Sequence, residues 1–268
     1  MNIPTVNYIM FALQIAAGLL LPAALGLILR KKYGCRPLPF FVGCLVFLGF
    51  ALVLESTVHN LVLTGSVGEK ILSAPWLYAL YGGLAAGLFE ECGRYLAFRT
   101  VLRKAQDEDK NALMYGAGHG GIECFALLAV TGVSNLVYAL LLSHGQEALL
   151  TAQVPEASLA QWEAIKLQLT QSAPEIYMLG IAERVLALAL QLSLTVPVWF
   201  AAKDGMRAKG LLPLAVLLHA AVDGSTALLG GVLPSVGVEL VLLLETLAAA
   251  LLARAIWKRY HVPAKAKE

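Results

Sequence analysis

The stretch that decides the fold is APWLYALYGGLAAGLFEECGRYLAFRTVL, residues 74–102. It is long and apolar enough to cross a bilayer as a helix, which takes about 20 residues at ~1.5 Å each. Towards its end it contains two adjacent carboxylates and an arginine, in the run Glu90-Glu91-Cys92-Gly93-Arg94. Charged groups inside a bilayer are costly, so they usually face one another and serve a function. The stretch therefore predicts a membrane-spanning helix that carries part of a polar site.

The composition is that of a protein with many membrane spans. Of 268 residues, 59% are apolar and 14% charged, and the mean hydropathy is +0.72, which favours transmembrane helices. The apolar runs lie at 5–29, 38–62, 74–102, 111–141, 176–202, 211–230 and 236–257. We expect one integral membrane domain over 1–268, an all-α transmembrane bundle of about seven helices surrounded by membrane lipids. We expect no nucleic-acid partner, although the net charge of +2 by itself says nothing on this point, and the sequence does not indicate an oligomeric state.

The basic residues predict how the chain is oriented. If the amino terminus is outside and the carboxyl terminus cytoplasmic, 16 of the 20 lysine and arginine residues fall on the cytoplasmic side, as the positive-inside rule requires. The first eight residues contain neither lysine nor arginine, so they do not resemble a cleavable signal peptide. The compact layout is typical of a prokaryotic cytoplasmic membrane protein.

The longest loop, about 142–175, is predicted to lie outside. Within it Leu159, Trp162, Ile165 and Leu169 recur at helical spacing, which indicates a short amphipathic helix lying on the outer leaflet. Such a helix is either a lid over a site or only a covering loop.

Three polar positions lie at one depth in the predicted bundle. At ~1.5 Å per residue, Glu91, His119 and His219 are each about 12 Å from the cytoplasmic end of their helix. Glu123 and Asp223 follow one turn later, on the same helix face as their histidine. We therefore expect these side chains to form one constellation.

The glutamate pair supplies the candidate catalytic acids. Two adjacent carboxylates cannot easily keep both charges in a low-dielectric site. Arg94 lies one turn from Glu90 and is expected to hold it by a bidentate pair. Glu91 points about 100° away around the helix and is left to activate water. The alternative is a buried ion pair that only fixes helix packing.

The two histidine–acid pairs supply candidate metal ligands. His119 with Glu123, and His219 with Asp223, each place an imidazole and a carboxylate on one helix face, as paired ligands or as a base with its orienting group. Together they supply the nitrogen and oxygen donors that Zn²⁺ takes. The glycines around His119 permit either close helix contact or a break that lines a water-filled cavity.

Other polar residues have less decisive positions. Glu183, beside Arg184, lies nearer the outer face, where a catalytic role and a packing role are equally compatible with the sequence. For Glu55 with His59, and for Glu239 and Glu245, we expect interfacial or packing roles. The cysteines show no CxxC spacing and are expected to be small buried apolar residues. They are Cys35, Cys44, Cys92 and Cys124.

The order of the polar motifs resembles that of the YhfC family of intramembrane metalloproteases, distant relatives of CAAX prenyl proteases and bacteriocin-processing membrane peptidases. The motifs are Glu90-Glu91-x-x-Arg94, Gly118-His119-Gly120-Gly121-Ile122-Glu123, Glu183-Arg184 and His219-x-x-x-Asp223. The resemblance covers roughly helices two to seven. It implies that Glu90 or Glu91 activates water, with His119 and His219 as ligands or hydrogen-bond donors. The broader group usually has three residues between the glutamates and the arginine, where this chain has two, so the motif does not decide which glutamate is catalytic.

These observations predict an intramembrane peptidase, acting on a membrane or membrane-associated peptide or protein with a glutamate-activated water, with or without zinc. The alternative is a proton- or cation-coupled transporter that uses the same buried cluster, although no inverted repeat is visible. A third interpretation is a membrane scaffold held in register by buried ion pairs.

Overall fold

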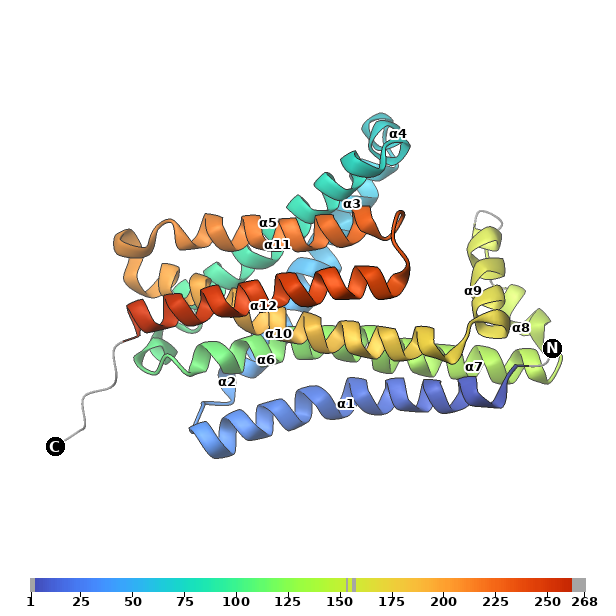
Figure 1. Ribbon diagram of the computed structural model, residues 1–268, viewed down its shortest axis with the longest axis horizontal. Coiled ribbons are helices and arrows are strands. Elements are labelled where there is room, and N and C mark those ends of the chain that lie inside the picture. Colours follow the sequence, from blue (N-terminus) through green and yellow to red (C-terminus); the bar gives the residue numbers. More distant parts are fainter. Residues whose placement is uncertain (1–2, 153, 156–157, 262–268) are drawn as a thin grey trace. The chain divides into compact units, whose positions relative to one another are not determined.

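The computed structural model describes residues 3–152, 154–155 and 158–261, and among them all regular structure is helical (Figure 1). The predicted all-α fold is confirmed. The helices are α1 (Thr5–Tyr33), α2 (Leu38–Val46), η1 (Phe47–Glu55), α3 (Ser56–Leu63), α4 (Ser66–Ser73), α5 (Pro75–Arg99), η2 (Arg103–Asp107), α6 (Asn111–Cys124), η3 (Phe125–Val130), α7 (Thr131–Ser143), α8 (Glu147–Thr151), α9 (Leu159–Gln171), α10 (Pro174–Asp204), η5 (Gly205–Ala208), α11 (Leu211–Leu229) and α12 (Ser235–Tyr260).

Six helical segments of the described chain are long and apolar enough to cross a membrane, or seven if α4 and α5 count as one bent span. The helices α2, η1 and α3 form one such segment, as do α6, η3 and α7. The two helices of the bent pair meet at 114°. The bend falls at Ala74, whose backbone is extended because the residue before a proline is biased away from the helical conformation. Pro75 then occupies the first turn of α5, where its missing N–H leaves no helical bond unmade.

The chain divides into two compact units. Unit 1 comprises Met1–Leu21 and Cys124–Arg184, and unit 2 comprises Pro22–Glu123 and Val185–Glu268. The single domain expected over 1–268 stays a prediction.

Unit 1 is held together by aromatic packing. Phe11 of α1 meets the ring of Tyr177 edge-on at 5.1 Å between centroids. The predicted helix of the long loop is α9, where Trp162 and Leu169 are buried in the same core as Phe11. These two apolar side chains of α9 therefore pack on protein, and whether the helix also rests on the outer leaflet stays a prediction. Lys166 of α9 joins this helix to α8 through an ion pair with Glu147, 2.8 Å long.

Close glycine contacts build unit 2 around α6. A Cβ on Gly118 would lie 1.9 Å from the carbonyl oxygen of Phe40 in α2, and one on Gly43 of α2 would lie 2.3 Å from the carbonyl oxygen of Tyr115. On another face of α6, Gly120 lies against Gln191 of α10. Because α6 is an unbroken helix over Asn111–Cys124, its glycines serve close helix contact.

The helices α5 and α11 also pack backbone to backbone. A Cβ on Gly83 would lie 2.3 Å from the carbonyl oxygen of Ala220, and one on Gly87 would lie 2.5 Å from that of Val216. This small-residue face resembles the GxxxG contacts of membrane helix pairs. It brings the glutamates of α5, one turn beyond Gly87, against α11.

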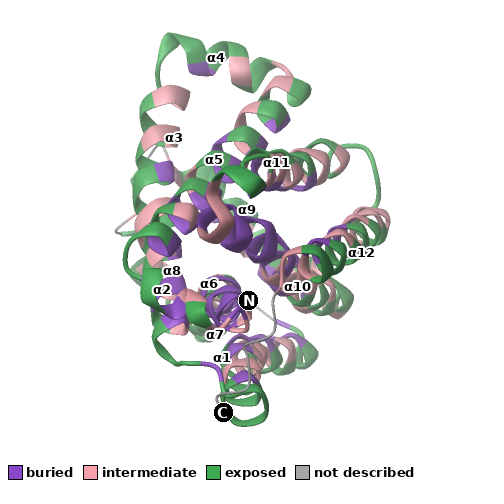
Figure 2. Cartoon of the chain, turned by 90° about the vertical axis from the view of Figure 1, so that its left-hand side faces the viewer, coloured by how far each residue is buried: buried purple, intermediate pink, exposed green. Residues whose placement is uncertain are grey.

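Burial of the cysteines differs partly from expectation. Cys35 and Cys124 are buried and Cys44 is half-buried, but Cys92 is exposed, so the prediction was wrong for Cys92. The packed face of α5 carries the buried glycines and glutamates, and Cys92 points away from it. By contrast α4 is exposed almost throughout (Figure 2).

The neighbouring glycines of α5 provide a stability test. We expect Gly83→Ala to lower the stability of detergent-solubilised protein by about 1–3 kcal/mol, because the methyl group meets backbone that cannot move aside cheaply. The matched control is Gly82→Ala, where a Cβ meets nothing within 4 Å. Thermal unfolding checks this, and equal midpoints for the two variants would contradict the packing described.

Candidate active site

Glu90 lies at the centre of a hydrogen-bonded group in unit 2. His119 Nε2 lies 2.7 Å from Glu90 Oε2, and Gln191 Nε2 donates to the same oxygen at 3.0 Å. His119 is fully buried and Glu90 is nearly so. The rings of Tyr115 and Phe47 pack against the imidazole, at 5.8 and 5.3 Å between centroids. The carboxylate is therefore held in a defined position by α6 and α10.

Glu91 points to different partners. Its Oε1 lies 2.7 Å from His219 Nδ1 of α11, and its Oε2 lies 3.4 Å from Arg94 Nη1. The expectation that Arg94 pairs with Glu90 and leaves Glu91 free was wrong, since the ion pair is with Glu91. Residues three and four apart both lie on one helix face, and the contact with His219 turns Glu91 rather than Glu90 towards the arginine. Glu91 and Arg94 are both fully buried.

Gln191 is a polar member of the group that the sequence analysis missed. Its side-chain oxygen accepts a hydrogen bond from Arg94, and its nitrogen donates to both Glu90 and Glu123, the latter at 3.3 Å. Thr195, one turn later, accepts from Arg94 Nη1 at 3.1 Å. An uncharged amide within the apolar run 176–202 is the signal that was available, since a buried amide needs partners.

The second imidazole nitrogen of His219 faces the first glutamate. His219 Nε2 lies 4.0 Å from Glu90 Oε2 and 3.6 Å from Asp223 Oδ2. The side chain of Asp223 is 42% exposed, against 9% for Glu90, so the group is more open on the side of Asp223. Glu90, His119, His219 and Asp223 thus occupy one region, whereas the depth argument predicted a group centred on Glu91, His119 and His219.

Other candidate residues have partners of their own. In unit 1, Glu183 forms an ion pair with Arg184, and the catalytic role predicted for Glu183 stays a prediction. In unit 2, His59 bridges Glu55 and Tyr81, with hydrogen bonds of 3.1 and 2.9 Å.

The four side chains predicted to bind a metal are not arranged as a metal site in the described part of the structure. Within the described residues, no group of three His, Cys, Asp or Glu side chains is arranged to hold a metal ion. His119 Nε2 is hydrogen-bonded to Glu90, and Glu123 accepts from Gln191. The donor types suit Zn²⁺, but in this arrangement the histidines form carboxylate pairs. The residues do not fit the predicted four-ligand site of His119, Glu123, His219 and Asp223.

Long apolar helices and a buried histidine–carboxylate group define a polytopic integral membrane protein with an intramembrane polar site. A family model described as YhfC intramembrane metalloprotease matches residues 17–243. The chain is also 36% identical over 215 residues, 79% of its length and 81% of the other's, to a Bacillus subtilis (strain 168) protein described as uncharacterized membrane protein YhfC. The chain therefore belongs to the YhfC family, as the motifs predict. No solved structure matches it. The bacterial relative supports the predicted cytoplasmic membrane location.

The two glutamates are expected to differ in their importance for stability. Glu91→Gln removes the charge that compensates a fully buried arginine, and breaking such a pair costs about 3–5 kcal/mol. Glu90→Gln keeps an oxygen that can accept from His119, so its thermal midpoint should stay close to that of the wild type. Thermal unfolding of both variants in the same detergent checks this. A Glu90→Gln variant as unstable as Glu91→Gln would contradict the assignment of the ion pair.

Proposed function

We propose that this protein is an intramembrane peptidase that hydrolyses peptide bonds of a membrane or membrane-associated protein. The observation that carries the proposal is the meeting of Glu90, His119 and His219 in a buried polar site inside a membrane bundle. The family description supports a peptidase rather than the transporter. It also implies a metal, whereas the side chains as they are arranged support a mechanism in which Glu90 itself activates the water.

Glu90 is the general base of the proposed reaction. A water molecule can hydrogen-bond both Glu90 Oε2 and His219 Nε2 across the 4.0 Å between them. Glu90 takes one proton from this water, whose oxygen bonds to the peptide carbonyl carbon. The same proton then passes to the leaving nitrogen as the C–N bond breaks, which yields a carboxylic acid and an amine. His119 and Gln191 hold Glu90 in position for both transfers.

His219 is the proposed donor to the oxyanion. Its Nδ1 is engaged by Glu91, which leaves Nε2 directed towards the reacting region. With both nitrogens protonated, His219 is an imidazolium near Glu90, Glu91 and Asp223, and these carboxylates stabilise its charge. A positioned cation stabilises the negative oxygen that develops in the transition state. Glu91 and Arg94 are thus positioning residues that act through His219.

The proposal predicts that Glu90→Gln abolishes cleavage while the protein stays folded. Removing a general base typically lowers the rate about 10²–10⁴-fold. Membranes from cells that express wild type or Glu90→Gln are incubated in H₂¹⁸O, and new protein termini are quantified by mass spectrometry. New termini with ¹⁸O in the released carboxyl group are expected for the wild type alone.

Two further variants complete this experiment. His119→Ala should behave as Glu90→Gln does. Cys92→Ala is the matched control, because its exposed thiol lies on α5 beside the glutamates but has no part in the reaction, and it should keep wild-type cleavage. The same new termini in the Glu90→Gln membranes would refute the proposed function.

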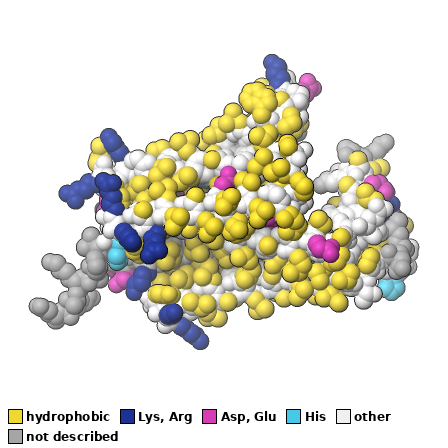
Figure 3. All heavy atoms as spheres, in the orientation of Figure 1, with side chains coloured by type: hydrophobic (Ala, Val, Ile, Leu, Met, Phe, Trp, Pro, Cys, Tyr) yellow, Lys and Arg dark blue, Asp and Glu magenta, His cyan; other side chains and the backbone are white. Residues whose placement is uncertain are grey.

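The side of the membrane near which a substrate is cut depends on how the chain is oriented in the bilayer. We propose that its amino terminus lies outside. Most of the basic side chains of unit 2 that are visible in Figure 3 gather at one end, where α12 finishes. A fluorescent-protein fusion after residue 268 should then fluoresce, as it folds in the cytoplasm. A phosphatase inserted between α8 and α9 should be active, because that enzyme requires the outside. The opposite pair of results would reverse the orientation.

A further inference from the structure

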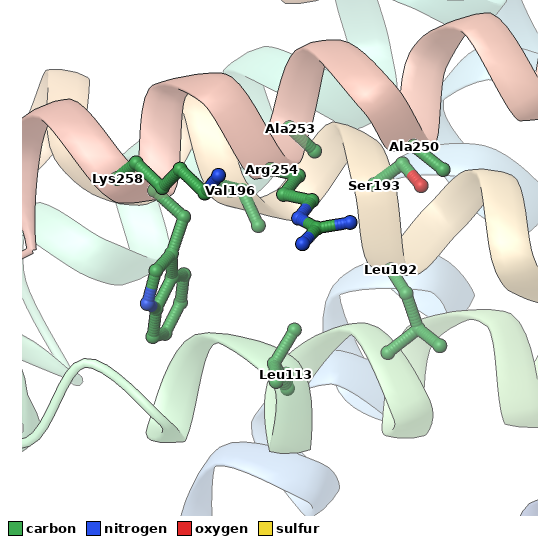
Figure 4. A pocket seen from close by; sticks show the side chains of 9 residues that line it. Leu113, Leu192, Ser193, Val196, Ala250, Ala253, Arg254 and Lys258 are labelled. Carbon is green, nitrogen blue, oxygen red and sulfur yellow. The ribbon is translucent and has the colours of Figure 1, made fainter.

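A groove on unit 2 is lined by residues of three helices. Leu113 of α6, Leu192, Ser193 and Val196 of α10, and Ala250, Ala253, Arg254, Trp257 and Lys258 of α12 enclose about 380 Å³ (Figure 4). This volume is within the range of ~300–1,000 Å³ typical of small-molecule sites. Apart from one hydroxyl and two cations, the lining is apolar.

The two cations distinguish the groove. Arg254 and Lys258 are exposed residues one helical turn apart, and like charges at this spacing repel each other. In the described part of the chain, no ion pair to a carboxylate is found for either side chain. Figure 4 shows the guanidinium of Arg254 extending from α12 into the space above Leu113. The site therefore has positive charge beside an apolar surface.

Three other basic residues of unit 2, unlike Arg254 and Lys258, are bound to acceptors of the protein itself. Lys203 forms an ion pair of 2.5 Å with the buried Asp109, Arg99 donates to the carbonyl of Ala202 at 3.2 Å, and Lys110 donates to that of Tyr33 at 2.8 Å.

A second groove of similar volume lies between α1, α2 and α6, and it is lined by Arg30. There the guanidinium donates to the carbonyl of Cys35 at 3.0 Å. A groove of similar volume therefore occurs elsewhere in unit 2, but that groove is not lined by two cations one helical turn apart.

The geometry points to a binding site for an anionic phospholipid, with the phosphate on Arg254 and Lys258 and an acyl chain along the apolar lining. Guanidinium groups bind phosphate oxygens with two parallel hydrogen bonds, and basic pockets between membrane helices take anionic head groups. Arg254 lies six residues, or about 9 Å, before the end of α12 at Tyr260. At that depth a long cationic side chain reaches the head groups while its stem stays in the apolar layer. Trp257 is a residue type enriched at the same interface.

Brominated lipids test this site, because bromine quenches a nearby tryptophan. Detergent-solubilised protein is titrated with brominated phosphatidylglycerol or brominated phosphatidylcholine, and the quenching due to Trp257 is taken as the difference between wild type and Trp257→Phe. If each cation contributes about a factor of five, phosphatidylglycerol should quench at roughly 25-fold lower concentration. Equal quenching by the two lipids would overturn the proposal.

Charge variants test whether the groove is the source of the preference for phosphatidylglycerol over phosphatidylcholine. Arg254→Gln/Lys258→Gln should bring the ratio of the two lipids close to one. Arg103→Gln/Lys104→Gln removes the same charge from exposed positions of η2 outside the groove, and should keep the selectivity. Loss of selectivity in both double variants would refute a specific site, since it would show a general effect of surface charge.

Two further measurements distinguish a bound lipid from other occupants of the groove. Ala250→Phe fills the groove without changing its charge and should abolish the quenching of Trp257 by either lipid. Excess inorganic phosphate should displace little phosphatidylglycerol, because the acyl chain contributes much of the binding. Full displacement by phosphate, or unchanged quenching in Ala250→Phe, would contradict an acyl chain in the groove.

Discussion

Glu91 is a fully buried carboxylate between His219 and Arg94, and the arrangement of the site depends on this ion pair. A charge removed from water is costly unless it is paired and hydrogen-bonded. Glu91 compensates the arginine, and the arginine in turn bonds Gln191 and Thr195 of α10. One acidic side chain of α5 thereby fixes α10 and α11 relative to it, and leaves Glu90 to face His119.

Such pairing requires the helices to approach closely. Glycines on α5 meet carbonyl groups of α11, and glycines on α6 meet the backbone of α2. Helices in a membrane gain little from apolar burial against one another, so close van der Waals contact and interhelical hydrogen bonds hold them. These contacts place α5 against α11 and α6 against α2, and in this packing Glu90 lies 2.7 Å from His119. The geometry of the site therefore depends on how closely the helices of unit 2 pack.

The sequence predicted much of the site but not its pairing. Depth along each helix placed Glu91, His119 and His219 at one level, and the structure places them together. The choice of Arg94 partner was wrong because spacings of three and four residues are equivalent on an isolated helix. Gln191 was missed because an uncharged residue gives a weak signal inside an apolar run. The prediction that Cys92 is buried was wrong because burial depends on which face of α5 packs against other helices.

What the sequence by itself determined is the set of membrane helices, the family and the polar residues within the spans, because length, hydropathy and motif order are properties of the chain alone. Only the tertiary structure decided that Glu90 meets His119, that Glu91 meets His219 and Arg94, and that Arg254 and Lys258 line an apolar groove. These contacts join helices far apart in sequence. Their distances depend on how closely glycine faces let the backbones approach, which periodicity along one helix does not specify.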